Sequence, residues 1–277
     1  MRASCESSDR RPWLRRVSIF LLLLAFGSAL FAGVLAPAGY DEQFREHPNA
    51  PPSRQFLLGT DELGRDRLSR LLHGSRVSFL LAPAAAALAT GIGLLMGTAA
   101  GYLGGWPARA ALELTDVVAS VPSLLLLLFA RAMLPLNVAP EVSVAITFVL
   151  LGTVGWTSGV RLFAAAIARA RDAEYIRQAL AAGGHPARVV RLHLSAAVLP
   201  LLTAQFWVLV PLFLLAEANL GMLGLGVSEP LPSLGNLLAE IQINPALREQ
   251  PFLLAPAALL LVVLLSVQNI AREENVS

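Results

Sequence analysis

Long apolar segments are the feature that most constrains what this chain can fold into. A helix needs about 20 mostly apolar residues to cross the hydrocarbon core of a bilayer. Six segments approach or exceed this length, at approximately 17–35, 79–99, 112–134, 142–166, 197–217 and 252–270. Only 14% of the 277 residues are charged, against about 25% in soluble domains. The sequence therefore predicts an all-α polytopic membrane protein with about six transmembrane helices.

Two of these segments are less regular than the others. The third is interrupted by Asp116, Pro122 and Arg131. The first follows a basic stretch and precedes "LAPA", which also fits a secretory signal peptide. Its apolar stretch of 19 residues is longer than the 7–15 residues typical of a signal core. We therefore favour an uncleaved anchor.

Arginine bias near the ends of the segments predicts the orientation, because cytoplasmic loops are enriched in basic residues. Five arginines precede the first segment, and the stretch 168–195 is also rich in arginine. We expect a cytoplasmic segment at 1–16, an anchor at 17–35, an extracytoplasmic loop with an interfacial helix at 36–78, and a five-helix core at 79–277. That core contains the cytoplasmic loop 168–195, and both termini are cytoplasmic.

Residue usage argues against several kinds of chemistry. All 21 basic residues are arginine, so the chain lacks the lysine that a P-loop places on phosphates. Cys5 is the single cysteine, which leaves no cysteine metal cluster. The four histidines show no HExxH pairing. We expect no catalytic residue, metal or cofactor in this chain.

The stretch "LLGTDELGRDRLSRLLHGSRVSF" at 57–79 places charges just before the second apolar segment. Gly59 and Gly64 free the backbone for tight turns. Thr60 or Asp61 is expected to cap the helix that follows.

Two opposite-charge pairs in this stretch have the i,i+4 spacing that stabilises helices, Asp61 with Arg65 and Asp66 with Arg70. Leucines give the expected helix an apolar face. It either lies at the interface and orients the second span, or forms part of an extracytoplasmic rim that meets partner proteins. The residues of interest are Gly59, Thr60, Asp61, Gly64, Arg65, Asp66, Ser69 and Arg70.

The stretch after the fourth apolar segment, "RDAEYIRQALAAGGHPARVVRLHLSAAVLPLL", predicts a helix–glycine–helix hairpin. Asp172 is suited to cap a helix at 173–182, which Gly183 would end. Pro186 suits the first turn of a second helix at 187–194. Such a basic hairpin fits equally a surface loop on anionic headgroups and a docking element for a soluble partner.

This stretch resembles the EAA loop of ABC importer permeases. Ala179, Gly183 and Pro200 fall on the family pattern, and "AEYI" fits the dipeptide/oligopeptide group. Arg177 and Gln178 depart from it, since glutamate and alanine are usual there. The resemblance implies that the first short helix docks in a groove of an ATPase subunit.

Other stretches resemble the same family in the same order along the chain. "LGTDELGRDRLSRLLHGSRVSF" is similar to a signature of its C-type permease subunits. "LELTDVVASVPSLLLLLFA", "GWTSGVR" and "EANLGMLGLGVSEPLPSLGNLLAE" are similar to further family motifs. The residues that these motifs and the EAA-like loop single out as structural or path candidates are Asp116, Pro122, Trp156, Arg161, Pro200, Glu217, Gly224 and Gly226.

The resemblance implies a type I ABC importer permease fold in the cell inner membrane. It implies partners: a second permease subunit, two cytoplasmic ATPases that bind the ATP, and an extracytoplasmic substrate-binding protein. Peptides or similar small solutes are the implied cargo. The implied coupling residues are Glu174, Tyr175, Arg177, Gln178, Ala179, Gly183 and Arg188.

Other functions remain open at this point. An intramembrane protease would need motifs such as GxSxG, which the sequence lacks. A stand-alone channel or secondary transporter would need ion-coupling charges, whereas charges within the spans are few. A diverged permease with weakened coupling is a further alternative because of Arg177. We expect Asp116 and Arg131 to snorkel from their span ends, and expect structural roles for these residues and for Glu217.

Overall fold

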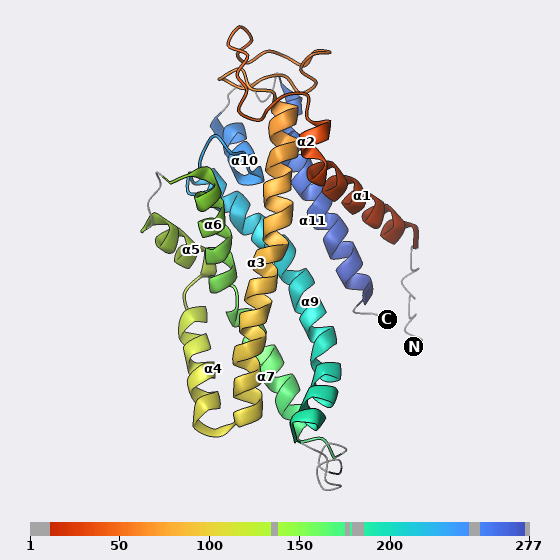
Figure 1. Cartoon of the computed structure of the whole chain (residues 1–277), viewed down its shortest axis with the longest axis vertical. Coiled ribbons are helices and arrows are strands. Elements are labelled where there is room, and N and C mark those ends of the chain that lie inside the picture. Colours follow the sequence, from red (N-terminus) through yellow and green to blue (C-terminus); the bar gives the residue numbers. More distant parts are fainter. Residues whose placement is uncertain (1–11, 134–137, 175–177, 179–185, 244–249, 275–277) are drawn as a thin grey trace, which may run out of the picture.

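The computed structural model describes residues 12–133, 138–174, 178, 186–243 and 250–274 (Figure 1). In these residues the regular structure is helical, with one isolated bridge between Thr60 and Asp66. The principal helices are α1 (Pro12–Leu30), α2 (Ala32–Leu35), α3 (Arg67–Leu103), α4 (Gly105–Ala119), α5 (Ser123–Ala132), α6 (Pro140–Val154), α7 (Thr157–Arg171), α9 (Pro186–Met222), α10 (Leu234–Ile243), the 3₁₀ helix η2 (Pro251–Leu254) and α11 (Ala255–Glu274).

The number of possible membrane spans agrees with the sequence. Four stretches are long and apolar enough to cross a membrane, namely Trp13–Leu30, Arg67–Leu103, Val198–Met222 and Pro251–Ile270. Two bent helix pairs also qualify if each counts as one span, which gives up to six. The prediction of an all-α polytopic protein with about six spans is confirmed.

The third and fourth expected spans are broken rather than continuous. Helices α4 and α5 meet at an angle of 78°, and α6 and α7 at 41°. The first break lies at 120–122 and ends with Pro122, which precedes the first turn of α5. A proline has no N–H to donate and clashes with the preceding turn of a helix, so the chain bends there. Gly155 and Trp156 form the second break.

Two other helices are longer than expected. Helix α3 has 37 residues and spans roughly 55 Å, so the helix expected at the interface is the first part of a continuous span. Helix α9 also has 37 residues, and the separate helix expected at 187–194 is its beginning. Figure 1 shows α3 running from the loop 36–66 to the opposite end of the bundle, where α4 begins. We call these the loop end and the far end.

Small residues allow α3 to lie close to α7. An ideal Cβ added to Gly97 would lie 2.6 Å from Phe163 Cβ, and one added to Gly101 would lie 2.5 Å from Ala164 O. Both distances are too short for any side chain beyond glycine. Transmembrane helices associate through such small-residue contacts because lipid provides no hydrophobic drive between them.

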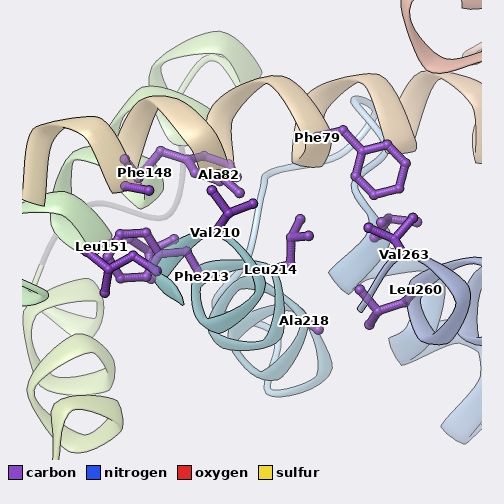
Figure 2. Packing of buried hydrophobic residues seen from close by; sticks show 14 of the residues in the cluster. Phe79, Ala82, Phe148, Leu151, Val210, Phe213, Leu214, Ala218, Leu260 and Val263 are labelled. Atoms are coloured by element: carbon purple, nitrogen blue, oxygen red, sulfur yellow. The ribbon is translucent and has the colours of Figure 1, made fainter. Parts of the chain in front are cut away.

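A second region of the core joins α3, α6, α9 and α11 nearer the loop end. Figure 2 shows Phe79 and Ala82 of α3 packed with Phe148 of α6, Val210 of α9 and Val263 of α11. All five side chains are buried. Helix α1 packs against α11 and α3 at the edge of the bundle. The segment expected as an anchor therefore contacts the other helices.

Candidate functional site

The charged stretch before α3 folds into a tight turn centred on Asp61. Its Oδ1 accepts hydrogen bonds from the backbone N–H of Leu63 at 2.9 Å and of Arg65 at 2.8 Å. Gly64 has a φ of +75°, and a Cβ there would lie 2.3 Å from Phe44 O. A side chain is therefore excluded at Gly64, as expected for a turn glycine.

Gly59 and Thr60 attach this turn to the loop before it. Gly59 has a φ of +70°, and a Cβ there would lie 2.3 Å from Ala50 O. The Thr60 hydroxyl donates to His47 O and accepts from Ala50 N–H. Both residues thus hold the loop and the turn together.

Asp66, rather than Thr60 or Asp61, caps helix α3. Its Oδ2 accepts from the N–H of Ser69 at 2.8 Å and from the Ser69 hydroxyl at 2.7 Å. The expected cap was wrong because Asp61 is already used by the turn. The expected Asp66–Arg70 pair is also absent from the described ion pairs, since the Asp66 carboxylate faces the helix N-terminus.

Arg65 and Arg70 join the turn to a distant part of the chain. The expected Asp61–Arg65 pair is present, with Nε 2.6 Å from Oδ2. Arg65 Nη1 also lies 2.7 Å from Glu229 Oε2. Arg70 Nη2 lies 3.0 Å from Glu229 Oε1 and 2.9 Å from Glu240 Oε1. We call these five residues the outer charge cluster.

The position of Arg70 makes this cluster an unusual one. Its side chain is fully buried, and its Nε lies 3.6 Å from Asp61 Oδ2. Buried charges are tolerated when they are paired and hydrogen-bonded. The cluster therefore fixes the start of α3 against α10 and against the segment between α9 and α10.

The surroundings shift the pKa values of the two glutamates of the cluster in opposite directions. Burial alone would raise the pKa of Glu229, but the adjacent Arg70 and Arg65 guanidinium groups bring it below its usual value. Burial raises the pKa of Glu240, and Arg70 only partly offsets this effect. Glu229 is thus held ionised, while Glu240 takes up a proton more readily.

A second buried polar group surrounds Glu217 of α9 and lies further along α3 than the outer charge cluster. This side chain is fully buried. Its Oε2 accepts from the Ser78 hydroxyl at 3.0 Å, and its Oε1 accepts from Gly235 N–H at 3.2 Å. Glu217 thereby links α9 to both α3 and α10.

Glycines let α10 approach α9 at this level. A Cβ on Gly221 would lie 2.3 Å from the carbonyl carbon of Gly235. Gly224 has a φ of +73°, and a Cβ on Gly226 would lie 2.8 Å from Gly221 Cα. The candidates Gly224 and Gly226 therefore serve the sharp return of the chain after α9.

Arg131 does not snorkel to the end of its helix, contrary to expectation. Its side chain is 1% exposed. Nε donates to Leu225 O at 3.0 Å, and Nη2 donates to Ser143 Oγ at 2.8 Å and Gly226 O at 3.2 Å. The guanidinium finds these backbone carbonyls because the α4–α5 bend turns α5 toward the segment after α9.

Asp116 of α4 and Arg161 of α7 form an ion pair. Both side chains are largely exposed in the single chain, at 53% and 62%. The pair lies close to both helix breaks, one of which ends at Pro122 and the other at Trp156. Pro200 lies inside α9 without ending it.

Most of the expected coupling residues lie outside what the structure describes. Tyr175, Arg177, Ala179 and Gly183 are outside the described residues, as is the side chain of Arg188. Glu174 Oε1 accepts from Gln178 Nε2 at 3.4 Å. Asp172 is the C-cap of α7, and the helix expected at 173–182 lies mostly outside the described residues.

Sequence reasoning missed Glu229 and Glu240 as members of the outer charge cluster. The stretch 36–78 has equal numbers of acidic and basic residues, so local pairing accounted for all its charges. A glutamate at 229, between two glycines and two prolines in "GLGVSEPLP", was the available signal. Among the described residues, no group of three or more His, Cys, Asp or Glu side chains is arranged to hold a metal ion.

Comparison with known proteins identifies the family. The model of the family described as "Binding-protein-dependent transport system inner membrane component" matches residues 89–272, which is more than half of the chain. This chain belongs to the ABC importer permeases. The permease is thus a multi-pass membrane protein with a type I importer permease fold.

Individual relatives agree with this family. The permease is 36% identical over 227 residues to the di/tripeptide transport system permease protein DppC of Pseudomonas aeruginosa, covering 80% of the permease and 73% of the relative. It is 31% identical over 247 residues to the oligopeptide transport system permease protein OppC of Mycobacterium tuberculosis, covering 89% and 83%. It is 30% identical over 222 residues to the dipeptide transport system permease protein DppC of Bacillus subtilis, covering 80% and 68%.

Proposed function

We propose that this permease forms one half of the translocation path of an ATP-driven importer of short peptides. The observation that carries the path assignment is the Asp116–Arg161 pair. Ionised side chains within transmembrane helices are costly and face a bundle interior or a water-filled cavity rather than lipid. Both members are more than half exposed in the single chain. Their exposed face therefore lines the path, against a second permease subunit.

The broken helices support the same location. In transporters, discontinuous helices often form the substrate route, because their irregular backbone needs polar surroundings. The α4–α5 and α6–α7 breaks both lie close to the Asp116–Arg161 pair. Peptide cargo is proposed because the compared relatives are named as di/tripeptide, dipeptide and oligopeptide permeases.

Coupling to the ATPases is assigned to the segment between α7 and α9. Residues Glu174 and Gln178 are four apart and hydrogen-bonded, as expected on one face of a helical turn. In this proposal the docking contact comprises Glu174, Tyr175, Arg177, Gln178, Ala179, Gly183 and Arg188. The arginine at 177 requires an ATPase groove whose charge matches it.

The remaining assignments follow from this arrangement. The loop end is extracytoplasmic and meets a substrate-binding protein, whereas the far end and both termini are cytoplasmic. The permease performs no covalent chemistry and binds no cofactor, since ATP is held by two partner ATPases. ATP-driven movement of the ATPases would then alternate the access of the path.

The path assignment is tested by thiol labelling of the assembled importer. Cys5→Ser removes the native thiol, and Asp116→Cys places one at the proposed wall. We expect modification by a charged thiol reagent that does not enter lipid. A control, Phe20→Cys on exposed α1, should remain unmodified. An unreactive thiol at position 116 would refute the path assignment.

The coupling assignment is tested by co-expression with an ATPase encoded beside the permease. We expect the ATPase to co-purify with the wild-type permease in detergent. Gly183→Val should abolish this capture. The matched substitution Gly33→Val, where a Cβ meets no atom within 4 Å, should preserve it. Equal capture by both variants, or none by the wild type, would contradict the proposed docking segment.

A further inference from the structure

A polar pocket lies beside the outer charge cluster, at the loop end. It has a volume of about 530 Å³ and is lined by Arg131, Glu229 and Glu240, with glycines of the segment after α9 and residues of α10. Pockets for small molecules are typically about 300–1,000 Å³ and have few polar groups. The size and charge of this pocket suit a small charged ligand.

The cationic wall of the pocket is incompletely satisfied. Arg131 is 1% exposed and forms no ion pair with any described carboxylate. Its Nε and Nη2 donate to carbonyl and hydroxyl oxygens. Its Nη1 is buried and has no partner within the described part of the chain. A buried guanidinium without a counter-ion favours an anion in the adjacent space.

The anionic wall also has an oxygen that is free to accept a further hydrogen bond. Glu240 Oε1 accepts from Arg70 at 2.9 Å, whereas its Oε2 accepts no hydrogen bond from the described residues, and the Arg67 guanidinium acts on this carboxylate through its charge alone. Both oxygens of Glu229 already accept hydrogen bonds from Arg65 and Arg70. Glu240 is therefore the carboxylate of this wall that is able to accept an incoming ammonium group.

We propose that this pocket is a subsite for a zwitterionic peptide, with Arg131 binding the terminal carboxylate and Glu240 binding the terminal ammonium group. The proposal rests on the assignment of short peptides as cargo and of the loop end as extracytoplasmic. A peptide released at the loop end would meet this pocket before it reaches the Asp116–Arg161 pair. The pocket would thus select for free peptide termini after release from the binding protein.

Modified tripeptides and matched variants test this proposal. The assembled importer in lipid nanodiscs, without its binding protein, is titrated with trialanine, N-acetyl-trialanine and trialanine amide. We expect trialanine to bind saturably and each modified peptide to bind about tenfold or more weakly, as expected for loss of a charged hydrogen bond. Arg131→Gln should weaken the binding of trialanine and leave the affinity for trialanine amide unchanged. Glu240→Gln should weaken the binding of trialanine and leave the affinity for N-acetyl-trialanine unchanged.

The two variants should thus lose discrimination against different modified peptides. This result separates a binding role from a folding role, because a misfolded variant would lose the binding of all three peptides together. A third variant, Ala239→Phe, fills the pocket without removing a polar group, and should abolish binding. The exposed control Gln242→Phe on the same helix should preserve it. Weakening of all ligands alike in both charge variants, or trialanine binding that survives Ala239→Phe, would overturn the subsite. Peptide uptake by the complete importer in the same variants would then show that the proposed function stands without it.

Discussion

Replacement of Arg70 by methionine should destabilise the permease strongly. Methionine preserves much of the side-chain volume but removes the cation shared by Asp61, Glu229 and Glu240. Arg65 still pairs with Asp61 and Glu229, whereas Glu240 loses its ion pair. Removing one partner of a fully buried ion pair costs about 3–5 kcal/mol. Because the Glu229 and Glu240 side chains are 50% and 35% exposed, water offsets part of this cost. We expect a loss of about 2–3 kcal/mol in the free energy of unfolding.

The free energy can be measured by titrating the purified permease in mixed micelles with a denaturing detergent, followed by tryptophan fluorescence. Arg76→Met is the matched control, since Arg76 is exposed on the same helix. We expect the control to change the free energy by less than about 0.5 kcal/mol. The cost of Arg70→Met should also fall as the pH approaches 4, because protonation removes the repulsion among the carboxylates. Equal stability of the two variants at neutral pH would refute the reasoning.

Three further predictions address the neighbouring contacts. Gly221→Ala should destabilise the permease by about 1–3 kcal/mol through overlap with Gly235. Gly91→Ala, in open space on α3, should be neutral or stabilising. Equal effects of the two substitutions in detergent unfolding would contradict the close approach of α9 and α10. Glu217→Leu should cost more than Glu217→Gln, because leucine leaves the Ser78 hydroxyl and Gly235 N–H buried without an acceptor; a reversed order would exclude the proposed link. Because the folded pKa of Glu229 is below its usual 4.5, its stabilising contribution is present above pH 4.5 and is lost as the pH falls through the folded value, so Glu229→Gln should flatten that part of the unfolding-versus-pH curve. An unchanged curve would argue against ionised Glu229 in the cluster.

The helical class and the approximate number of spans could be predicted from the sequence because apolar length is a local property. The bends could be predicted only in part. Pro122 marks the first break, but nothing in the pattern around Gly155 distinguishes a break from an ordinary glycine in a span. The continuity of α3 through Arg67–Leu103 was missed because its charged first turns look unsuited to a span.

The site shows the same division between local and distant contacts. The Asp61–Arg65 pair was predicted because four residues separate its members. The contacts of Arg70 with Glu229 and Glu240 join residues that are 159 and 170 positions apart, and no local spacing encodes them. The family resemblance identified Glu217, Gly224 and Gly226 as residues of interest, but their shared role appears only when α10 folds back on α9.

Peptide uptake by the reconstituted importer tests the central claim most directly. Proteoliposomes would contain the permease, its second permease subunit and its ATPases, with the binding protein outside and ATP inside. We predict accumulation of labelled trialanine that requires both ATP and the binding protein. If the binding protein captures the peptide and the ATPases remain assembled, yet no uptake follows, the permease is not the peptide path that we propose.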